Sequence, residues 1–329
     1  MSQNPLLLSD RPSSAGWRAD ATDVLTTVMD ALRLRSRVFC RSELRAPWGM
    51  ALKRSDYAHF HVIERGSAWL RIEGQEPVAL AGGDLVVVPH GTGHTLTDSL
   101  ATKARPLGEM AGRRASESGC VVMRGGGKGA ETQLVCGSFR FERRDAHPLV
   151  ELLPPLIHLR PAETPAAEWL EATLRFLAWE TREAKPGTET IVSRLTDVIF
   201  VQVLRAWTLS LPEGHGGWMG ALRDRHVGAA LAHFHRSPER RWTNASLAEA
   251  VGMSRSRFAA RFTALVGEPP LAYLSRWRLE TAAGLLQDGA LGVGEIASRV
   301  GYESDAAFSK AFRRRFGAPP GAYRRSAAA

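Results

Sequence analysis

The sequence has no long apolar run and very little cysteine. Its early apolar run, Leu6–Leu8, is too short for the hydrophobic region of a secretory signal. No stretch approaches the roughly 20 apolar residues that span a bilayer. The three cysteines, Cys40, Cys120 and Cys136, are odd in number and widely spaced, which argues against a disulfide scaffold and fits a reducing compartment. We therefore expect a cytoplasmic protein without a membrane association.

Acidic residues are scarce in the last third of the chain. The 329 residues carry a net charge of +9. Residues 230–329 hold 15 Lys and Arg against 8 Asp and Glu, whereas the first 229 residues hold 28 against 26. A positive excess confined to one segment is typical of a domain that binds a polyanion, because neutralised phosphates supply much of the affinity for DNA. A solvated basic surface would have the same composition, so charge alone leaves both interpretations open.

The pattern of apolar, polar and turn-forming residues changes along the chain and divides it into parts. Residues 1–20 are polar and are expected to be disordered. Residues 21–160 hold short β-branched and aromatic runs separated by Gly, Pro and Asp, which indicates an antiparallel sandwich or barrel, with Leu100–Gly129 as a loop. Residues 161–211 have apolar residues at helical spacing. This segment is expected to be a connector or a dimer interface, followed by a linker at 212–222.

The last hundred residues contain an internal repeat with a spacing of 49 or 50 residues. The first copy holds Ala248, Val251, Gly252, Phe258, Phe262, Gly267, Pro269, Pro270 and Tyr273, matched in the second by Ala297, Val300, Gly301, Phe308, Phe312, Gly317, Pro319, Pro320 and Tyr323. Agreement over so many uncommon residue types indicates two copies of one supersecondary unit.

Each copy predicts a helix-turn-helix. Gly252 and Gly301 can adopt the positive φ that ends a first, short helix and turns the chain sharply. Ser254 and Ser304 can then cap a second helix, because a hydroxyl accepts hydrogen bonds from the amides at a helix start. A second helix with one apolar face and one polar face is the part that enters the major groove of DNA in such units.

The repeat sets the limits of a helical DNA-binding domain at residues 223–326. We expect the two units at about 244–266 and 293–316, joined by a linker helix at Leu271–Leu286 that holds them in successive major grooves. The residues expected to meet DNA are Arg255, Ser256, Arg257, Ala260 and Arg261 in the first unit, and Ala306, Ser309, Lys310, Arg313 and Arg314 in the second.

Residues from about 226 to 325 resemble the DNA-binding domain of the AraC/XylS family of bacterial transcription regulators. The resemblance is carried by ASLAEAVGMSRSRFAARFTALVGEPPLAYL and VGEIASRVGYESDAAFSKAFRRRFGAPPGAYRR. It implies a sequence-specific regulator of transcription that binds double-stranded DNA as a homodimer and, if it is an activator, contacts RNA polymerase. Ala260 stands where many members have a groove-facing arginine, so the first unit is expected to read fewer bases or to rely on Arg257 and Arg261.

The segments HFHVIERGSAWLRIEG and GGDLVVVPHGTGHTLTD resemble the two cupin motifs. His59, His61, Glu64 and Gly66 match the first motif loosely, because the glutamate comes early, and Pro89, Gly91 and His94 match the second. The resemblance implies a small cupin-type β-barrel that senses a small-molecule effector. The expected fold is therefore α+β with two domains: a barrel followed by helices, then an all-α domain with two helix-turn-helix units.

Histidines and cysteines of the cupin-like part carry further hypotheses. In metal-containing cupins, residues at the positions of His59, His61 and His94 ligate a divalent cation, and an added cysteine thiolate would favour zinc. Many sensory cupins bind no metal at these positions. Oxidant sensing would instead use a reactive thiol, for which the candidates are Cys40, Cys120 and Cys136. We expect no enzymatic activity, and the alternative is a metal-dependent cupin enzyme with a DNA-binding tether.

Overall fold

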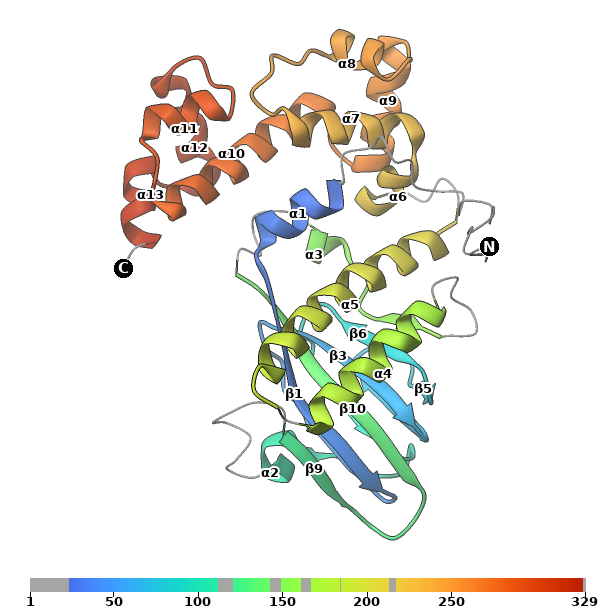
Figure 1. Cartoon of the computed structure of the whole chain (residues 1–329). Coiled ribbons are helices and arrows are strands. Elements are labelled where there is room, and N and C mark those ends of the chain that lie inside the picture. The colour runs from blue at the N-terminus through green and yellow to red at the C-terminus, as the bar shows by residue number, and fades with distance from the viewer. Residues whose placement is uncertain are drawn as a thin grey trace, which may run out of the picture.

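The computed structural model describes residues 24–111, 121–142, 149–160, 167–183, 185–212 and 217–327. An N-terminal part built on β-sheets is followed by helices and by a helical C-terminal part (Figure 1). In these ranges, no helix is both long enough and apolar enough to cross a membrane. The predicted disordered segment, residues 1–20, and Cys120 lie outside the described residues.

Eleven strands are found in the described part of the N-terminal half. They are β1 (Leu34–Arg45), β2 (Gly49–Leu52), β3 (Ala58–Arg65), β4 (Ser67–Ile72), β5 (Val78–Ala81), β6 (Leu85–Val88), β7 (His94–Thr97), β8 (Arg105–Pro106), β9 (Val121–Gly126), β10 (Glu131–Phe141) and β11 (Ile157–Leu159). One sheet has the order β11-β6-β3-β10-β1-β9 and the other the order β5-β4-β7-β2-β8. Among the described residues no strand pairing joins the two sheets, so they form an open sandwich where the sequence predicts a barrel.

Strand β9 corrects one expectation. It lies inside Leu100–Gly129, which the sequence predicts to be a loop, and it pairs in parallel with β1 from Cys40↔Val121 to Arg45↔Gly126. The two glycines of β9 argue against a strand at the level of sequence, because glycine is depleted in strands. The partner strand therefore decides the conformation of this segment.

Side chains of β3 alternate between the two faces of the larger sheet. Phe60 and Val62 belong to the core under the helices, whereas Ile63 belongs to the core between the sheets. Because successive strand residues point to opposite faces, His59 and His61 lie on the face of Ile63. The two cupin-motif histidines of β3 are therefore directed between the sheets.

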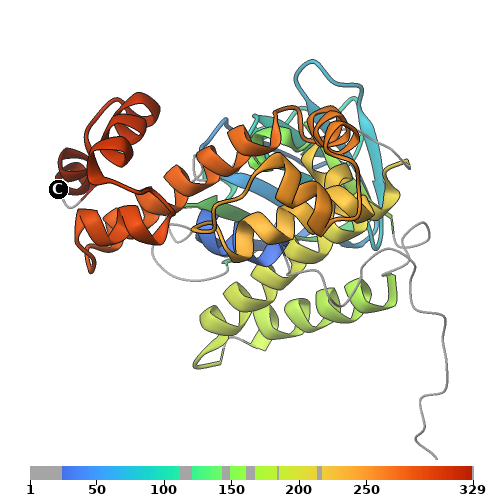
Figure 2. The same cartoon turned by 90° about the horizontal axis from the view of Figure 1, so that it is seen from above.

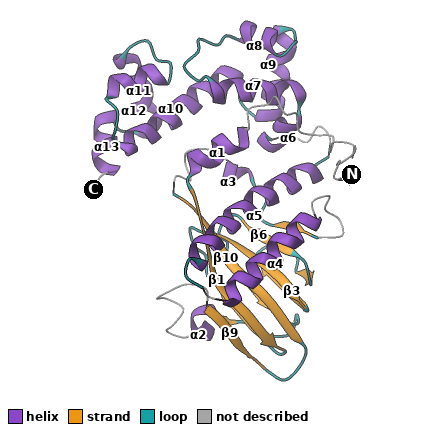
Figure 3. Cartoon of the chain, in the orientation of Figure 1, coloured by secondary structure: helices purple, strands orange, loops and turns teal. Residues whose placement is uncertain are grey.

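Helices cover the outer face of the larger sheet (Figures 1 and 3). The helices of this half are α1 (Val24–Leu32), α2 (Leu107–Ala111), α3 (Leu149–Leu152), α4 (Ala167–Glu183) and α5 (Thr188–Ser210). Helix α5 lies along β1, and its Phe200 ring packs against Phe139 of β10 with centroids 4.6 Å apart. The predicted connector segment is thus a pair of helices packed on the sheet.

The C-terminal half is helical. It contains α6 (Trp218–Arg223), α7 (Arg225–Arg236), α8 (Asn244–Ala250), α9 (Arg255–Val266), α10 (Pro270–Asp288), α11 (Val293–Arg299), α12 (Asp305–Phe316) and α13 (Pro320–Ala327). Helix α10 runs between two compact groups of helices (Figure 2). The predicted linker at 212–222 is wrong in its second half, because α6 begins there and buries Trp218 and Met219. The apolar side chains of Trp218 and Met219 indicate burial, but the glycines that precede them are typical of a linker.

The two DNA-binding units belong to different apolar clusters. Phe258 and Phe262 of the first unit, with Tyr273 in the first part of α10, belong to one cluster with α1, α5 and the larger sheet. Phe308 and Phe312 of the second unit form a separate cluster with the last part of α10. The first unit therefore shares its core with the N-terminal half, and the second unit has a core of its own.

Candidate nucleic-acid interface

The first unit consists of α8, a tight turn and α9. Helix α8 begins with a reciprocal capping box, in which Thr243 and Ser246 each accept a hydrogen bond from the other's backbone amide. It ends at Ala250, and Gly252, two residues later, has a φ of +68° that allows the turn. Ser254 stands at the N-cap of α9 as predicted, but its side chain makes no capping hydrogen bond.

The second unit repeats this construction with α11 and α12. Gly301 has φ +82°, and the hydroxyl of Ser304 accepts a hydrogen bond of 3.2 Å from the Ala307 amide. A Cβ on Gly301 would lie 2.7 Å from the backbone of Glu239, whereas one on Gly252 would meet nothing within 4 Å. The second turn is therefore packed against the segment before α8, and the first turn is open.

Helix α9 has one buried and one exposed face. Phe258 and Phe262 are fully buried. The exposed residues include the five that the sequence predicts to meet DNA, Arg255, Ser256, Arg257, Ala260 and Arg261. Arg261 differs from the others because its Nε donates a hydrogen bond of 2.7 Å to the carboxylate of Asp224, which caps α7. This ion pair holds the Arg261 side chain against its own domain.

Helix α12 carries a more basic outer face. Phe308 and Phe312 are buried, Ser309 is half-buried, and four predicted DNA-binding residues are exposed: Ala306, Lys310, Arg313 and Arg314. The neighbouring Arg315 donates two hydrogen bonds, of 3.0 and 2.7 Å, to the buried carboxylate of Glu280 in α10. All three consecutive arginines are exposed, but Arg315 is held by Glu280, whereas Arg313 and Arg314 lie with Lys310 on the outer face.

The tyrosine of the Pro-Pro-x-x-Tyr segment that follows each unit forms hydrogen bonds with neighbouring helices. The Tyr273 hydroxyl accepts a hydrogen bond of 3.1 Å from Trp218 Nε1 and lies 2.7 Å from His235 Nε2. Burial lowers the pKa of His235 to about 3, with a smaller contribution from the charge of Arg276. The neutral ring can therefore accept a hydrogen bond from the Tyr273 hydroxyl. In the second unit the Tyr323 hydroxyl accepts from Gln287 at 3.2 Å.

The cupin-motif histidines are connected in a buried chain between the sheets. His94 Nδ1 donates to the Thr92 carbonyl at 2.8 Å, which leaves Nε2 of a neutral His94 as an acceptor for His61 Nε2–H at 2.7 Å. The remaining Nδ1 of His61 then accepts from the Cys136 thiol at 3.0 Å. Burial lowers the pKa of His61 and of His94, which fits neutral rings.

This arrangement does not fit a metal ion. Zinc lies about 2.0–2.1 Å from each imidazole nitrogen, so two ligating nitrogens cannot be as close as the 2.7 Å between His61 and His94. His59 Nε2 faces Ser55 Oγ at 2.9 Å, and Glu64 pairs with Arg41 on the other face of the sheet. In the described part of the chain no three His, Cys, Asp or Glu residues form a group that could hold a metal.

The structure describes the three cysteines unequally. Cys136 is fully buried, and its Sγ lies 3.0 Å from His61 Nδ1. Cys40 lies in β1 next to a register shift, and its side chain, like all of Cys120, lies outside what is described. The hypothesis of oxidant sensing stays a prediction.

Two helix-turn-helix units joined by one long helix define a DNA-binding protein. The cupin family model matches residues 23–208, more than half of the chain, and a helix-turn-helix domain model matches residues 247–326. Relatives at up to 35% identity over most of the chain are named AraC-like transcription regulators. The chain belongs to the AraC-like transcription regulators that carry an N-terminal cupin domain.

Three relatives and one structure illustrate the similarity. An AraC-like transcription regulator of Streptomyces lividans is 35% identical over 304 residues, 92% of this chain and 98% of the relative. The HTH-type transcriptional regulator AlkR of Acinetobacter baylyi is 30% identical, with coverage of 92% and 99%. The RCS-specific activator RclR of Escherichia coli is 31% identical over 80% of this chain and 83% of its own length. The DNA-binding domain of AdpA, solved with a target DNA, is 33% identical, covers 31% of this chain and 92% of that chain, and has a TM-score of 0.30.

Proposed function

We propose that this regulator activates nearby genes in the cytoplasm in response to a small-molecule effector sensed by its cupin domain. The observation that carries the DNA-binding part is the outer face of α12, where Lys310, Arg313 and Arg314 are exposed side by side. Phosphates are bound by such cations, and base edges by side chains on the same helix face. The relative from E. coli is named an activator, which supports activation.

The length of α10 supports reading of two adjacent groove segments by one chain. Its 19 residues rise ~1.5 Å each, so the helix is ~28 Å long. Successive major grooves on one side of DNA are about 34 Å apart. With α9 at one end and α12 at the other, both second helices can reach DNA from the same side.

Exposed aromatic residues on α4 support a homodimer. Phe176 and Trp179 are 45% and 46% exposed, and their rings stack with centroids 6.0 Å apart. Large aromatic side chains that neighbour one another on a helix are typical of protein interfaces. A second copy of the chain is the partner we propose for this surface, and RNA polymerase is the partner proposed for the DNA-bound activator.

The sensor interpretation is preferred to a metal-dependent cupin enzyme with a DNA-binding tether. Catalysis by a cupin metal needs a complete ligand set and an open position, whereas His61 and His94 are hydrogen-bonded to each other and His59 to Ser55. Zinc in the cupin domain remains a prediction of the sequence, which elemental analysis of the purified chain tests. Oxidant sensing is tested by Cys→Ser variants of Cys40, Cys120 and Cys136 in a reporter strain exposed to oxidant.

Genome-wide mapping of sites bound by the full chain tests the proposal. We expect a shared sequence motif with two segments about one helical turn apart, located upstream of genes whose expression falls when the regulator is deleted. Purified protein should prefer such a site over random DNA at physiological salt by at least about a thousandfold. Equal binding to both DNAs at every salt concentration contradicts the proposal.

A further inference from the structure

Helix α10 passes from the first DNA-binding unit to the second at Arg278. Trp277 belongs to the apolar cluster that holds Phe258 of the first unit, and Leu279 belongs to the cluster that holds Phe308 of the second. Arg278 lies between them and is half-buried. Long helices are rarely straight, so a continuous helix does not by itself fix the angle between the units at its ends. The contacts of Arg278 therefore bear on how the two units are oriented.

Arg278 binds the turn that precedes α8, residues 237–242. Its Nε donates a hydrogen bond of 2.6 Å to the Pro238 carbonyl, and its Nη2 donates one of 2.9 Å to the Arg240 carbonyl. The turn is anchored in the first unit by Trp242, a buried member of that unit's apolar cluster. Burial lowers the pKa of Arg278, and hydrogen bonds in such a partly dehydrated place are stronger than in water. The guanidinium thus ties the middle of α10 to the first unit.

The second unit meets Arg278 at the turn before α12. A Cβ on Gly301 would lie 2.7 Å from Arg278 Nη2 and 2.7 Å from the Glu239 Cα, closer than such atoms approach in proteins. The Gly301 backbone therefore packs directly on the guanidinium and on the turn that the guanidinium binds. We call Arg278, the backbone of residues 238–240 and Gly301 the junction. It brings the linker helix and both units together in one place.

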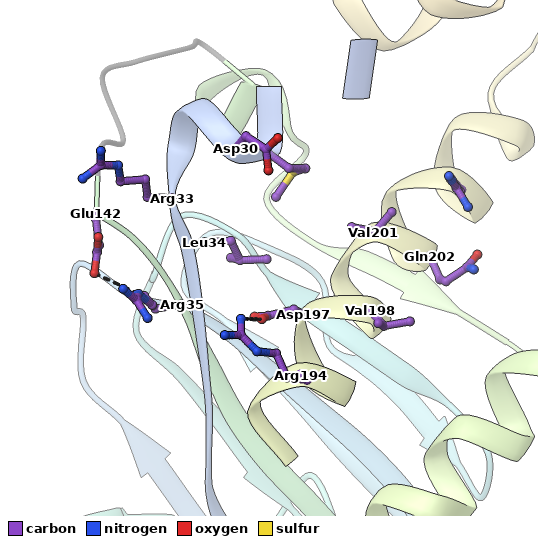
Figure 4. Close-up of a pocket in the computed structure, with 12 residues that line it drawn as sticks. Asp30, Arg33, Leu34, Arg35, Glu142, Arg194, Asp197, Val198, Val201 and Gln202 are labelled. Carbon is purple, nitrogen blue, oxygen red and sulfur yellow. Dashed lines mark hydrogen bonds and ion pairs between the residues drawn. The ribbon is translucent and has the colours of Figure 1, made fainter. Parts of the chain in front are cut away.

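Two ion pairs outside the junction are more exposed. Arg241 lies 3.1 Å from Glu303 in the second turn, and their side chains are 81% and 72% exposed. Arg33 directly follows α1 and lines a cavity between α1, β1 and α5 (Figure 4). It pairs with Asp288, the last residue of α10, with exposures of 40% and 46%. Exposed ion pairs contribute little because water screens them. The junction is therefore the contact expected to hold the two units at a fixed angle.

We infer that Arg278 is a positioning residue for DNA recognition, which sets the angle between α9 and α12 and thereby the spacing of the two DNA segments that the chain accepts. One base pair inserted between the segments moves them apart by about 3.4 Å and rotates one relative to the other by about 35°. Units held by the junction cannot follow this change, whereas units joined only by a helix that bends can. The inference rests on the proposed reading of two groove segments by one chain, and it names the residue that makes this reading selective for spacing.

A spacing series of DNA duplexes tests the inference on the full chain. The starting duplex is one that the purified chain selects from random-sequence DNA. Further duplexes have one base pair added or removed between the two segments, or random sequence in place of either segment. For the wild type, adding or removing a base pair should weaken binding at least about tenfold, as much as one mismatched base pair costs. Fluorescence anisotropy measures each affinity.

The variant R278K keeps the charge but loses the fork of donors that reaches two carbonyls, because a lysine has one ammonium on a flexible stem. Its spacing penalty should be at least about fivefold smaller than that of the wild type, the lower end of ordinary coupling between sites. Its affinity for the single-segment duplexes should be unchanged. R276K is the matched control, because Arg276 makes two hydrogen bonds, of 3.0 and 2.6 Å, to Glu268 within the first unit. R276K and D288N should keep the full penalty.

Equal binding of the wild type to all spacings overturns the inference without any variant. A full penalty in R278K overturns it, and so does a loss of the penalty in D288N alone, which would assign the angle to the contact with the N-terminal half. An R278K chain that is unfolded by circular dichroism, or that binds every duplex equally less well, makes Arg278 a residue of the fold and also overturns the positioning role. A chain that selects no site refutes the regulator function itself, and one that selects a site but accepts every spacing refutes only this inference.

Discussion

Arg315 and Glu280 form a two-point contact across the second DNA-binding unit. Nε and Nη2 of the arginine in α12 donate to one carboxylate oxygen of the glutamate in α10, whose side chain is 2% exposed. A buried carboxylate needs such donors, because burial without them is costly. The contact fixes the angle between the linker helix and the helix expected to enter the groove.

Two neighbouring arginines of α12, Arg314 and Arg315, should differ in their contribution to stability. Arg315→Ala is expected to lower the free energy of unfolding by about 1.5–3 kcal/mol, because hydrogen bonds to a charged group are lost. Arg314→Ala is expected to change it by less than about 0.5 kcal/mol, since Arg314 is exposed. Urea denaturation followed by circular dichroism measures both. Equal destabilisation by the two variants would contradict the assignment of Arg315 to support.

Lys310 tests whether α12 reads bases. Lys310→Ala should weaken binding to a mapped site by about 1–3 kcal/mol if the ammonium contacts a base. In that case its effect on random DNA is much smaller, and specificity relaxes at one position of the site. Fluorescence anisotropy with both DNAs measures the difference. A uniform loss on both would make Lys310 a phosphate contact, with a smaller dependence of affinity on salt.

The two repeat tyrosines should differ in their contribution to stability. Tyr273→Phe removes the acceptor of the buried Trp218 N–H and the partner of His235, and a buried polar group that loses its partner costs about 1–3 kcal/mol. Tyr323→Phe removes a contact with Gln287 at the surface, so we expect about 0.5 kcal/mol or less. Thermal unfolding of both variants gives the comparison. A larger effect of Tyr323→Phe would contradict the network described around Tyr273.

Acid should destabilise the first unit through His235. Burial holds the pKa of this histidine at about 3 in the folded chain, whereas an unfolded histidine has a pKa of about 6.5. The unfolded state therefore binds more protons between these values, and stability falls as the pH is lowered below 6.5. The slope from this group is about 1.4 kcal/mol per pH unit. Urea midpoints between pH 7 and 5 should fall less steeply in His235→Gln, and an unchanged slope would show that His235 is not the source.

The two turn glycines should not be equivalent, although the repeat aligns them. Gly252→Ala is expected to cost about 1–2 kcal/mol, the strain of an alanine at positive φ. Gly301→Ala should cost a further 1–3 kcal/mol or so, because its Cβ would overlap the Glu239 backbone and overpacking is destabilising. Denaturation midpoints of the two variants decide this. Equal costs would mean that the segment around Glu239 moves freely aside.

Sequence spacing determined the helices of the DNA-binding half because the signals for them are local. Phe258 and Phe262 lie one helical turn apart and recur as Phe308 and Phe312, so the buried faces of α9 and α12 follow from helical geometry alone. The positive φ of Gly252 and Gly301 follows in the same way from the need for a sharp turn. The outer faces are the complement of the buried ones, which is why the exposed residues of the candidate DNA interface were predictable.

Only the tertiary structure decided which of those residues have other partners. Arg261 pairs with Asp224 and Arg315 with Glu280, at separations of 37 and 35 residues, and no local pattern encodes contacts over such separations. The packing of α6 under the first unit and the pair Arg33–Asp288 likewise depend on how whole elements meet. Periodicity fixes the face of a helix, but the neighbour that covers this face is set by the folding of the entire chain.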